Sequence, residues 1–137
     1  MKLIGFNFSK ISIEKKSDKK ENLKINTNIN IVDISEIKTD FFNSKEILLG
    51  VQFNYTIDYS PSIAKIFFEG NILLSIDPKE AKEILKEWKS KKLQDNFRNI
   101  VFNIVFRKCN IKALQIEDEM NLPLHLPMPI IKNQKDK

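Results

Sequence analysis

Apolar and polar residues alternate along the first half of the chain in four stretches, residues 4–13, 23–31, 47–57 and 64–76. Side chains of a β-strand point to opposite faces in turn, so a period of two predicts a strand with one buried face. Asn and Lys fill the polar positions of the second stretch, which favours an antiparallel sheet with its other face in water. The pattern therefore predicts four antiparallel strands.

Three irregularities interrupt these strands. The alternation slips by one residue between Phe8 and Ile11, which predicts a β-bulge in the first strand. Residues 33–45 show no clear period, and we interpret them as an irregular connection. Gly50 and Gly70 lie inside strands, where glycine is typical of a bulge or of close packing by another element.

The pattern changes to a helical period after residue 76. Asp77 suits the N-cap, Pro78 the first helical position and Glu80 the reciprocal position of a capping box. The apolar residues that follow are spaced i, i+3, i+4 and i+7, which predicts a short helix with one buried face. They are Ala81, Ile84, Leu85 and Trp88.

A second, longer helix is predicted from Asp95 to about Asn121, before Pro123. At about 100° per residue its apolar residues form two stripes on roughly opposite sides. A helix on the surface of a monomer needs one such stripe. We therefore expect one stripe to cover the sheet and the other to contact a second subunit, with coverage by the short helix as the alternative. The stripe assigned to the oligomer interface is Phe102, Phe106, Cys109, Ala113, Ile116 and Met120, and the other is Leu93, Phe97, Ile100, Ile104, Ile111 and Leu114.

The C-terminal segment is apolar but interrupted by proline. Residues 122–131 alternate Leu and Met with three prolines, so they cannot be helical and are expected to lie extended across the domain surface. A chain of 137 residues suits one domain. We assign residues 1–131 to that domain and residues 132–137 to a disordered basic tail.

Composition narrows the class of protein. Apolar residues make up 42% of the chain, enough for a core, and the formal net charge is +5. Cys109 is the single cysteine, which excludes an intrachain disulfide and suits a reducing cytoplasm. No signal peptide is visible, and no apolar run approaches the ~18 residues of a membrane-spanning helix. We expect a soluble cytoplasmic protein without membrane insertion.

Motifs for catalysis and cofactors are missing. Gly5, Gly50 and Gly70 are the only glycines and lie far apart, which excludes a phosphate-binding loop. His125 is the sole histidine and we interpret it as an ordinary polar position, since no nucleophile motif accompanies it. One His and one Cys are too few for a zinc site. The acidic residues 117–119 point in different directions on a helix and are read as its solvated end. We predict no enzyme, no metal and no cofactor.

A surplus of apolar side chains is the one positive indication of function. Phe41, Phe42 and Phe67 lie outside the regular core pattern, as does the Leu- and Met-rich tail. Together they are predicted to line a groove for extended apolar segments of other proteins, with packing in an oligomer core as the alternative. The tail residues of this set are Leu122, Leu124, Leu126 and Met128.

The order of elements resembles SecB-type export chaperones. Residues 11–14 (ISIE) are similar to the end of that family's bulged first strand, residues 68–73 (FEGNIL) to its fourth strand, and residues 121–129 (NLPLHLPMP) to the tail after its long helix. The similarity spans nearly the whole chain. It implies a SecB-like α+β fold and a holdase that keeps unfolded polypeptide clients soluble without ATP. It also implies a homotetramer, a dimer of dimers with the long helices packed between sheets.

Two departures from that family affect the expected partners. The long aromatic loop after the first strand is replaced by a short charged turn, and Phe41 and Phe42 are the candidates to substitute for it. The family is usually acidic, so a charge of +5 argues against docking on a SecA-type motor. The same charge motivates the alternative of a nucleic-acid-associated accessory protein. Nucleic acid is the weaker prediction, because the lysines lie in turns and the tail instead of among exposed aromatics.

Overall fold

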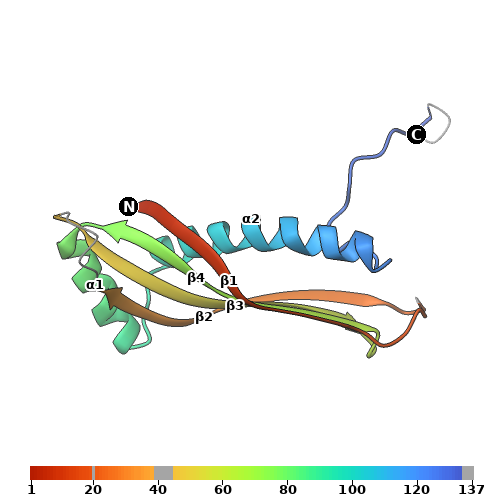
Figure 1. Ribbon diagram of the computed structural model, residues 1–137, viewed down its shortest axis with the longest axis horizontal. Helices are drawn as coiled ribbons and strands as arrows, with labels where there is room; N and C mark the ends of the chain where they lie inside the picture. Colours follow the sequence, from red (N-terminus) through yellow and green to blue (C-terminus); the bar gives the residue numbers. More distant parts are fainter. Residues whose placement is uncertain (20, 39–44, 134–137) are drawn as a thin grey trace.

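Four long antiparallel strands are followed by two helices in the computed structural model, which describes residues 1–19, 21–38 and 45–133 (Figure 1). The strands pair in the order β1-β4-β3-β2, so β1 and β2 form the two edges of the sheet. The predicted α+β class is therefore confirmed. The elements are β1 (Lys2–Lys15), β2 (Lys24–Ile37), β3 (Ile47–Ser60), β4 (Ala64–Ile76), α1 (Pro78–Lys89) and α2 (Asp95–Glu119).

One face of the sheet is apolar and carries both helices. On β3 every second residue from Leu49 to Tyr59 is buried, and these residues share one core with residues of α1 and α2. The opposite face carries polar side chains such as Gln52 and Asn54. The alternation of the sequence thus predicted correctly which side of the sheet is covered.

Bulges adjust the two edge strands. β1 has the predicted register shift between Phe8 and Lys10, and a second one near its start. β2 has a shift between Ile31 and Asp33, after which Ile34 points into the core. The expectation that an irregular connection starts at residue 33 was wrong, because the strand continues through this bulge to Ile37. One extra residue reverses which side chains face the core, and that ended the alternation.

Gly70 allows an aromatic ring to cross the middle of the sheet. A Cβ atom at this position would lie 2.4 Å from the carbonyl oxygen of Asn7 and 2.7 Å from Cζ of Phe53. The Phe53 ring in turn stacks on Phe6, with ring centroids 5.3 Å apart. The prediction of close packing at Gly70 is confirmed.

Both helices end in the same backbone motif. After α1, the amide of Lys92 donates to the Glu87 carbonyl (2.9 Å) and that of Lys91 to the Trp88 carbonyl (3.1 Å). Lys91 adopts a left-handed conformation with φ of 58°. This is the Schellman motif, whose left-handed residue is usually glycine. It turns the chain sharply from α1 into the approach to α2.

At the end of α2 the left-handed residue is Asn121, with φ of 54°. The amide of Leu122 donates to the Glu117 carbonyl (2.8 Å), and the Leu122 side chain is buried. The helix stops at Glu119, two residues before the predicted end. The chain then folds back over the sheet.

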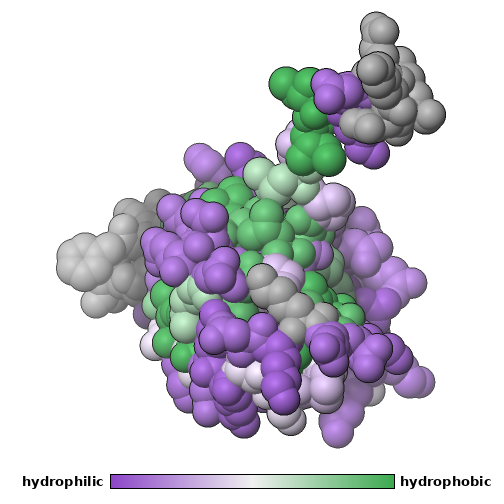
Figure 2. Space-filling view, turned by 90° about the vertical axis from the view of Figure 1, so that its right-hand side faces the viewer, coloured by the Kyte–Doolittle hydropathy of each residue, from purple (hydrophilic) through white to green (hydrophobic). Residues whose placement is uncertain are grey.

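Only the start of the C-terminal segment lies on the domain. Residues 122–126 pack against it, whereas residues 127–133 extend away from it (Figures 1 and 2). Met128 is 55% exposed and Ile131 is fully exposed. The segment is non-helical as predicted, but the expectation that all of 122–131 crosses the surface was wrong. The prediction for the last six residues falls largely on 134–137, outside the described residues.

Candidate functional site

A groove of about 730 Å³ lies between β2, α1 and the first turns of α2. Its size falls within the roughly 300–1,000 Å³ of typical ligand sites. Aliphatic residues of β2 form one wall, and aromatic and aliphatic residues of the two helices form the other. The apolar lining consists of Ile29, Ile31, Ile34, Leu85, Trp88, Leu93 and Phe102.

The charged residues that line this β2–α1–α2 groove are mostly cationic. Lys89, Lys91 and Arg98 line it, against a single carboxylate, Asp33. The Asp33 carboxylate accepts a hydrogen bond from Nε1 of Trp88 (3.3 Å). Arg98 forms an ion pair with Asp95. Within the part of the chain that the structure describes, Lys89 and Lys91 form no ion pair, so the groove has an excess of positive charge.

The strand that borders the groove is an edge strand. β2 pairs with β3 on one side, and no strand among the described residues pairs with its other side. An edge strand presents unpaired backbone N–H and C=O groups, to which an extended peptide can add as a further strand. The groove can therefore offer main-chain hydrogen bonds from β2 together with apolar contacts from Trp88 and Phe102.

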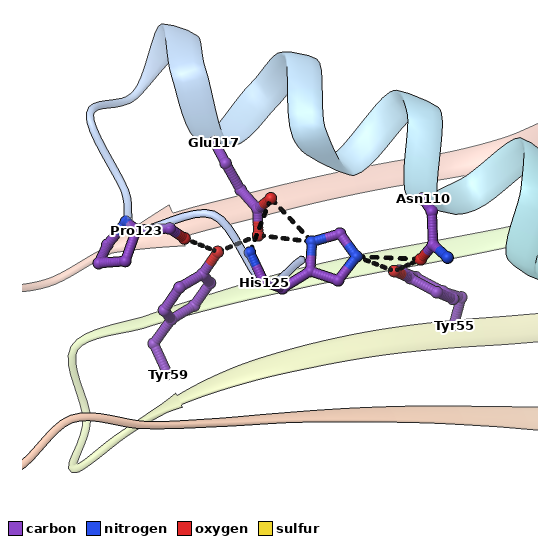
Figure 3. Close-up of polar contacts among 6 residues, drawn as sticks. All are labelled: Tyr55, Tyr59, Asn110, Glu117, Pro123 and His125. Atoms are coloured by element: carbon purple, nitrogen blue, oxygen red, sulfur yellow. Dashed lines mark hydrogen bonds and ion pairs between the residues drawn. The ribbon is translucent and has the colours of Figure 1, made fainter. Parts of the chain in front are cut away.

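A buried polar network fixes the start of the C-terminal segment at the opposite end of α2 (Figure 3). The Glu117 side chain is 0% exposed, and Nδ1 of His125 lies 2.8 Å and 3.0 Å from its two carboxylate oxygens. A carboxylate only accepts, so Nδ1 donates. The Tyr59 hydroxyl contacts the same carboxylate and lies 2.8 Å from the carbonyl oxygen of Pro123.

The other side of the histidine ring completes this network. Nε2 of His125 lies 3.0 Å from Oδ1 of Asn110 and 3.2 Å from the Tyr55 hydroxyl, which itself donates to Asn110 (2.6 Å). Burial raises the pKa of Tyr55 and of Tyr59, and the hydrogen bond to Glu117 raises that of Tyr59 further. Both phenols therefore stay protonated and act as donors. The network joins β3, α2 and the C-terminal segment.

Sequence reasoning missed this network. The interpretation of His125 as an ordinary polar position and of Glu117 as part of a solvated helix end was wrong, since both side chains are buried. The left-handed turn at Asn121 brings His125 back onto the helix. The neighbouring Asp118 and Glu119 are exposed, as expected. In the described part of the chain, no His, Cys, Asp and Glu side chains gather into a group that could hold a metal ion.

The face of α2 that covers the sheet matches neither predicted stripe, because it takes residues from both stripes and also includes Val101 and Val105, which belong to neither. Residues four apart on an α-helix differ in direction by about 40° around the helix axis. A row of such residues therefore winds around α2, as contact with a twisted sheet requires. Cys109, Ala113 and Ile116, assigned to the oligomer interface, are buried by this chain's own sheet, and that part of the assignment was wrong. Phe102 lines the groove, Met120 is half-buried, and Phe106 is 40% exposed. The residues of α2 that cover the sheet are Phe97, Val101, Val105, Cys109, Ala113 and Ile116.

The predicted groove residues do not come together in one site. Phe41 and Phe42 lie outside the described residues. Phe67 lies on the outer face of the sheet, where Nζ of Lys10 is 5.6 Å from its ring centroid. The tail follows α2 on the helix-covered side of the sheet, opposite to Phe67, but at the far end of α2 from the groove. Of these, Leu122 is buried, and Leu124, Leu126 and Met128 are exposed.

The thiol of Cys109 is expected to be almost unreactive in the folded protein. Burial raises its pKa from an ordinary value of 9.0 to about 12. At pH 8 this lowers the thiolate fraction about a thousand-fold, and the thiolate is the reactive form. Labelling with a disulfide reagent at pH 8 should therefore be slow in buffer and fast in denaturant. Rapid labelling in buffer would show that α2 does not stay on the sheet.

None of the helices among the described residues is long and apolar enough to span a membrane. No protein-family profile and no curated protein sequence matches the chain. Among solved structures, the chain is similar to a SecB-like chaperone of Mycobacterium tuberculosis in complex with a ChAD peptide from an antitoxin. The TM-score is 0.57 at 11% sequence identity, and the match covers 96% of this chain and 91% of that one. The resemblance that the sequence suggested is confirmed at the level of architecture: this chain has a divergent SecB-like fold.

Proposed function

We propose that the protein is an ATP-independent molecular chaperone that holds non-native polypeptides in the β2–α1–α2 groove. The observation that carries this proposal is an aromatic and aliphatic groove that runs beside an unpaired strand edge. Apolar burial is non-directional and contributes roughly 25 cal/mol per Å². Main-chain hydrogen bonds to β2 are also independent of side-chain identity. Such a site accepts many unfolded sequences and needs no nucleotide.

The comparison with solved structures supports a peptide as the ligand. The SecB-like chaperone with the same fold was solved with a peptide from an antitoxin bound to it. A segment of another protein is therefore a ligand that this architecture accommodates. Neither the groove nor the comparison favours the alternative of a nucleic-acid-associated protein. The proposed role is non-catalytic and cytoplasmic, in general proteostasis or for a dedicated client.

We also propose that the chain works as a homo-oligomer, assembled as a tetramer. Large apolar side chains remain exposed on α2 and on the edge strand β1. Exposed apolar surface of this kind is typical of contacts between subunits. On α2 they are Phe106 and Ile111, and on β1 they are Leu3, Ile4 and Ile11.

Substituting Phe102 with aspartate is expected to lower the affinity for an unfolded client at least tenfold. The change places a charge among the apolar side chains that line the groove. Losing one apolar contact of about 1.5–3 kcal/mol accounts for a factor of ten or more. Suppression of aggregation of a chemically unfolded client, measured by light scattering at equal molar amounts, reports the effect.

Asn103→Asp is the matched control, since Asn103 follows Phe102 on the same helix, is exposed and is outside the groove. This variant should hold clients as the wild type does. A wild-type protein that leaves the aggregation of several unfolded clients unchanged would contradict the proposed function. An equal loss of aggregation suppression in both variants would show that clients bind outside the groove.

A further inference from the structure

We infer that the β2–α1–α2 groove selects apolar segments that carry acidic residues, and discriminates against segments flanked by basic residues. The inference rests on the proposed function and names the class of polypeptide that the groove takes. Three cationic side chains and one carboxylate line the groove. The carboxylate, Asp33, already accepts the indole N–H of Trp88. A bound segment with its own carboxylates would meet cations.

Lys89 and Lys91 are the groups best placed for this selection. Neither forms an ion pair with another described residue, whereas Arg98 shares its charge with Asp95. Both lysines therefore keep a full charge for a ligand. Both lysines are solvent-exposed, so their attraction for a ligand should be strongest at low salt. Opposite charge on the ligand raises the association rate and like charge repels the wrong ligand.

The backbone conformation of Lys91 allows the contribution of its charge to be tested. Lys91 occupies the left-handed position of the Schellman motif, with φ of 58°. A residue with a side chain is strained there by about 1 kcal/mol relative to glycine. A glycine would end α1 with less strain but would remove a cation from the groove.

Trp88 makes the inference directly measurable. It is the only tryptophan of the chain, and it lines the groove. Its fluorescence therefore reports occupancy by any peptide without tryptophan. The probes are three synthetic peptides with one common core of Leu, Phe and Val, flanked at both ends by two Glu, two Gln or two Lys.

The Glu-flanked peptide is expected to bind about tenfold more tightly than the Lys-flanked peptide at low salt, with the Gln-flanked peptide between them. This gap should narrow as salt is raised towards 1 M, where the Debye length is about 3 Å. Equal affinities for the three peptides, or tighter binding of the Lys-flanked peptide, would overturn the inference and leave the proposed function intact. If none of the peptides binds, the proposed function itself fails.

The variant Lys91→Gly tests whether the charge of Lys91 contributes to binding, because it removes the charge without destabilising the fold. It should unfold at a higher temperature than the wild type, because glycine relieves the left-handed strain. It should also bind the Glu-flanked peptide about threefold more weakly, while its affinity for the Gln-flanked peptide stays unchanged. Lys92→Gln is the matched control, since it removes a neighbouring charge that does not line the groove. An equal loss in Lys92→Gln would show that net charge, and not the groove, sets the preference.

Discussion

Replacing His125 with alanine is expected to lower the free energy of unfolding by about 3 kcal/mol, because a buried carboxylate then loses its partner. Glu117 is 0% exposed and accepts from the imidazole at 2.8 Å. In the variant, the backbone amide of residue 125, which donates to the carboxylate at 3.3 Å, is kept, but the imidazole N–H is lost without replacement. The Tyr59 hydroxyl remains as a donor, but it is also bonded to Pro123. Residues 122–126 should come loose from the domain well below the unfolding temperature.

Urea unfolding followed by circular dichroism measures this loss, and limited proteolysis detects release of the C-terminal segment. Met128→Ala is the control in the same segment, since Met128 is exposed and should change stability by less than about 0.5 kcal/mol. A double-mutant cycle with Glu117→Gln should give a coupling energy above about 1 kcal/mol. Additive effects of the two substitutions would contradict the pairing.

Replacing Gly70 with alanine is expected to lower the free energy of unfolding by about 2–3 kcal/mol, the cost of overfilling a packed interior. The added methyl group would lie 2.4 Å from the carbonyl oxygen of Asn7, a backbone atom of the adjacent strand. It would also lie 2.7 Å from the ring of Phe53. Neither can give way without separating β1 from β4 or moving the stacked Phe6 and Phe53 rings.

Gly5→Ala is the control for this experiment, because Gly5 lies in β1 and its nearest neighbour would be Cβ of Leu73 at 3.9 Å. That is an ordinary contact, so this variant should retain wild-type stability within about 0.5 kcal/mol. Thermal and urea unfolding of the two variants side by side test the difference. If Gly70→Ala unfolds at the wild-type midpoint, the close approach of β1 and β4 at this point is not maintained in solution.

The strands could be predicted because burial of one sheet face dictates a period of two. The alternation on β3 and β4 matched the structure nearly to the residue. β2 was the exception. The bulge after Ile31 shifts the phase of the strand, and a phase shift looks the same in sequence as the end of a strand. Residues 33–37 were misread for that reason.

The candidate site could be predicted much less well. The groove is assembled from β2, α1 and α2, and which residues of these elements meet depends on how the helices cross the sheet. The apolar pattern shows that a residue is buried but does not show what buries it. Phe67 was chosen for its local pattern, and the structure places it on the other face of the sheet. Trp88 was assigned to the core and Phe102 to an oligomer contact, whereas both line the groove.

The network of Glu117 and His125 did leave a signal in the sequence. Asn followed by an apolar residue, as in Asn121 and Leu122, is a signature of the Schellman turn. Such a turn reverses the chain, so the residues after it return over the last turns of the helix. The position of His125 then follows. The pairing with Glu117 required a view of the fold in three dimensions.

The small size of the groove has a consequence for how long polypeptides are retained. A volume of about 730 Å³ accommodates only a few side chains, so one copy grips a short stretch of an unfolded chain. Such contacts form quickly and, one by one, also break quickly. Linking several grooves in one particle makes each rebinding step intramolecular, with an effective concentration in the millimolar range, and avidity can then exceed the affinity of one site by about 10²–10⁴. On the proposed function, long retention is a property of the assembled particle, while a single subunit is limited to brief encounters.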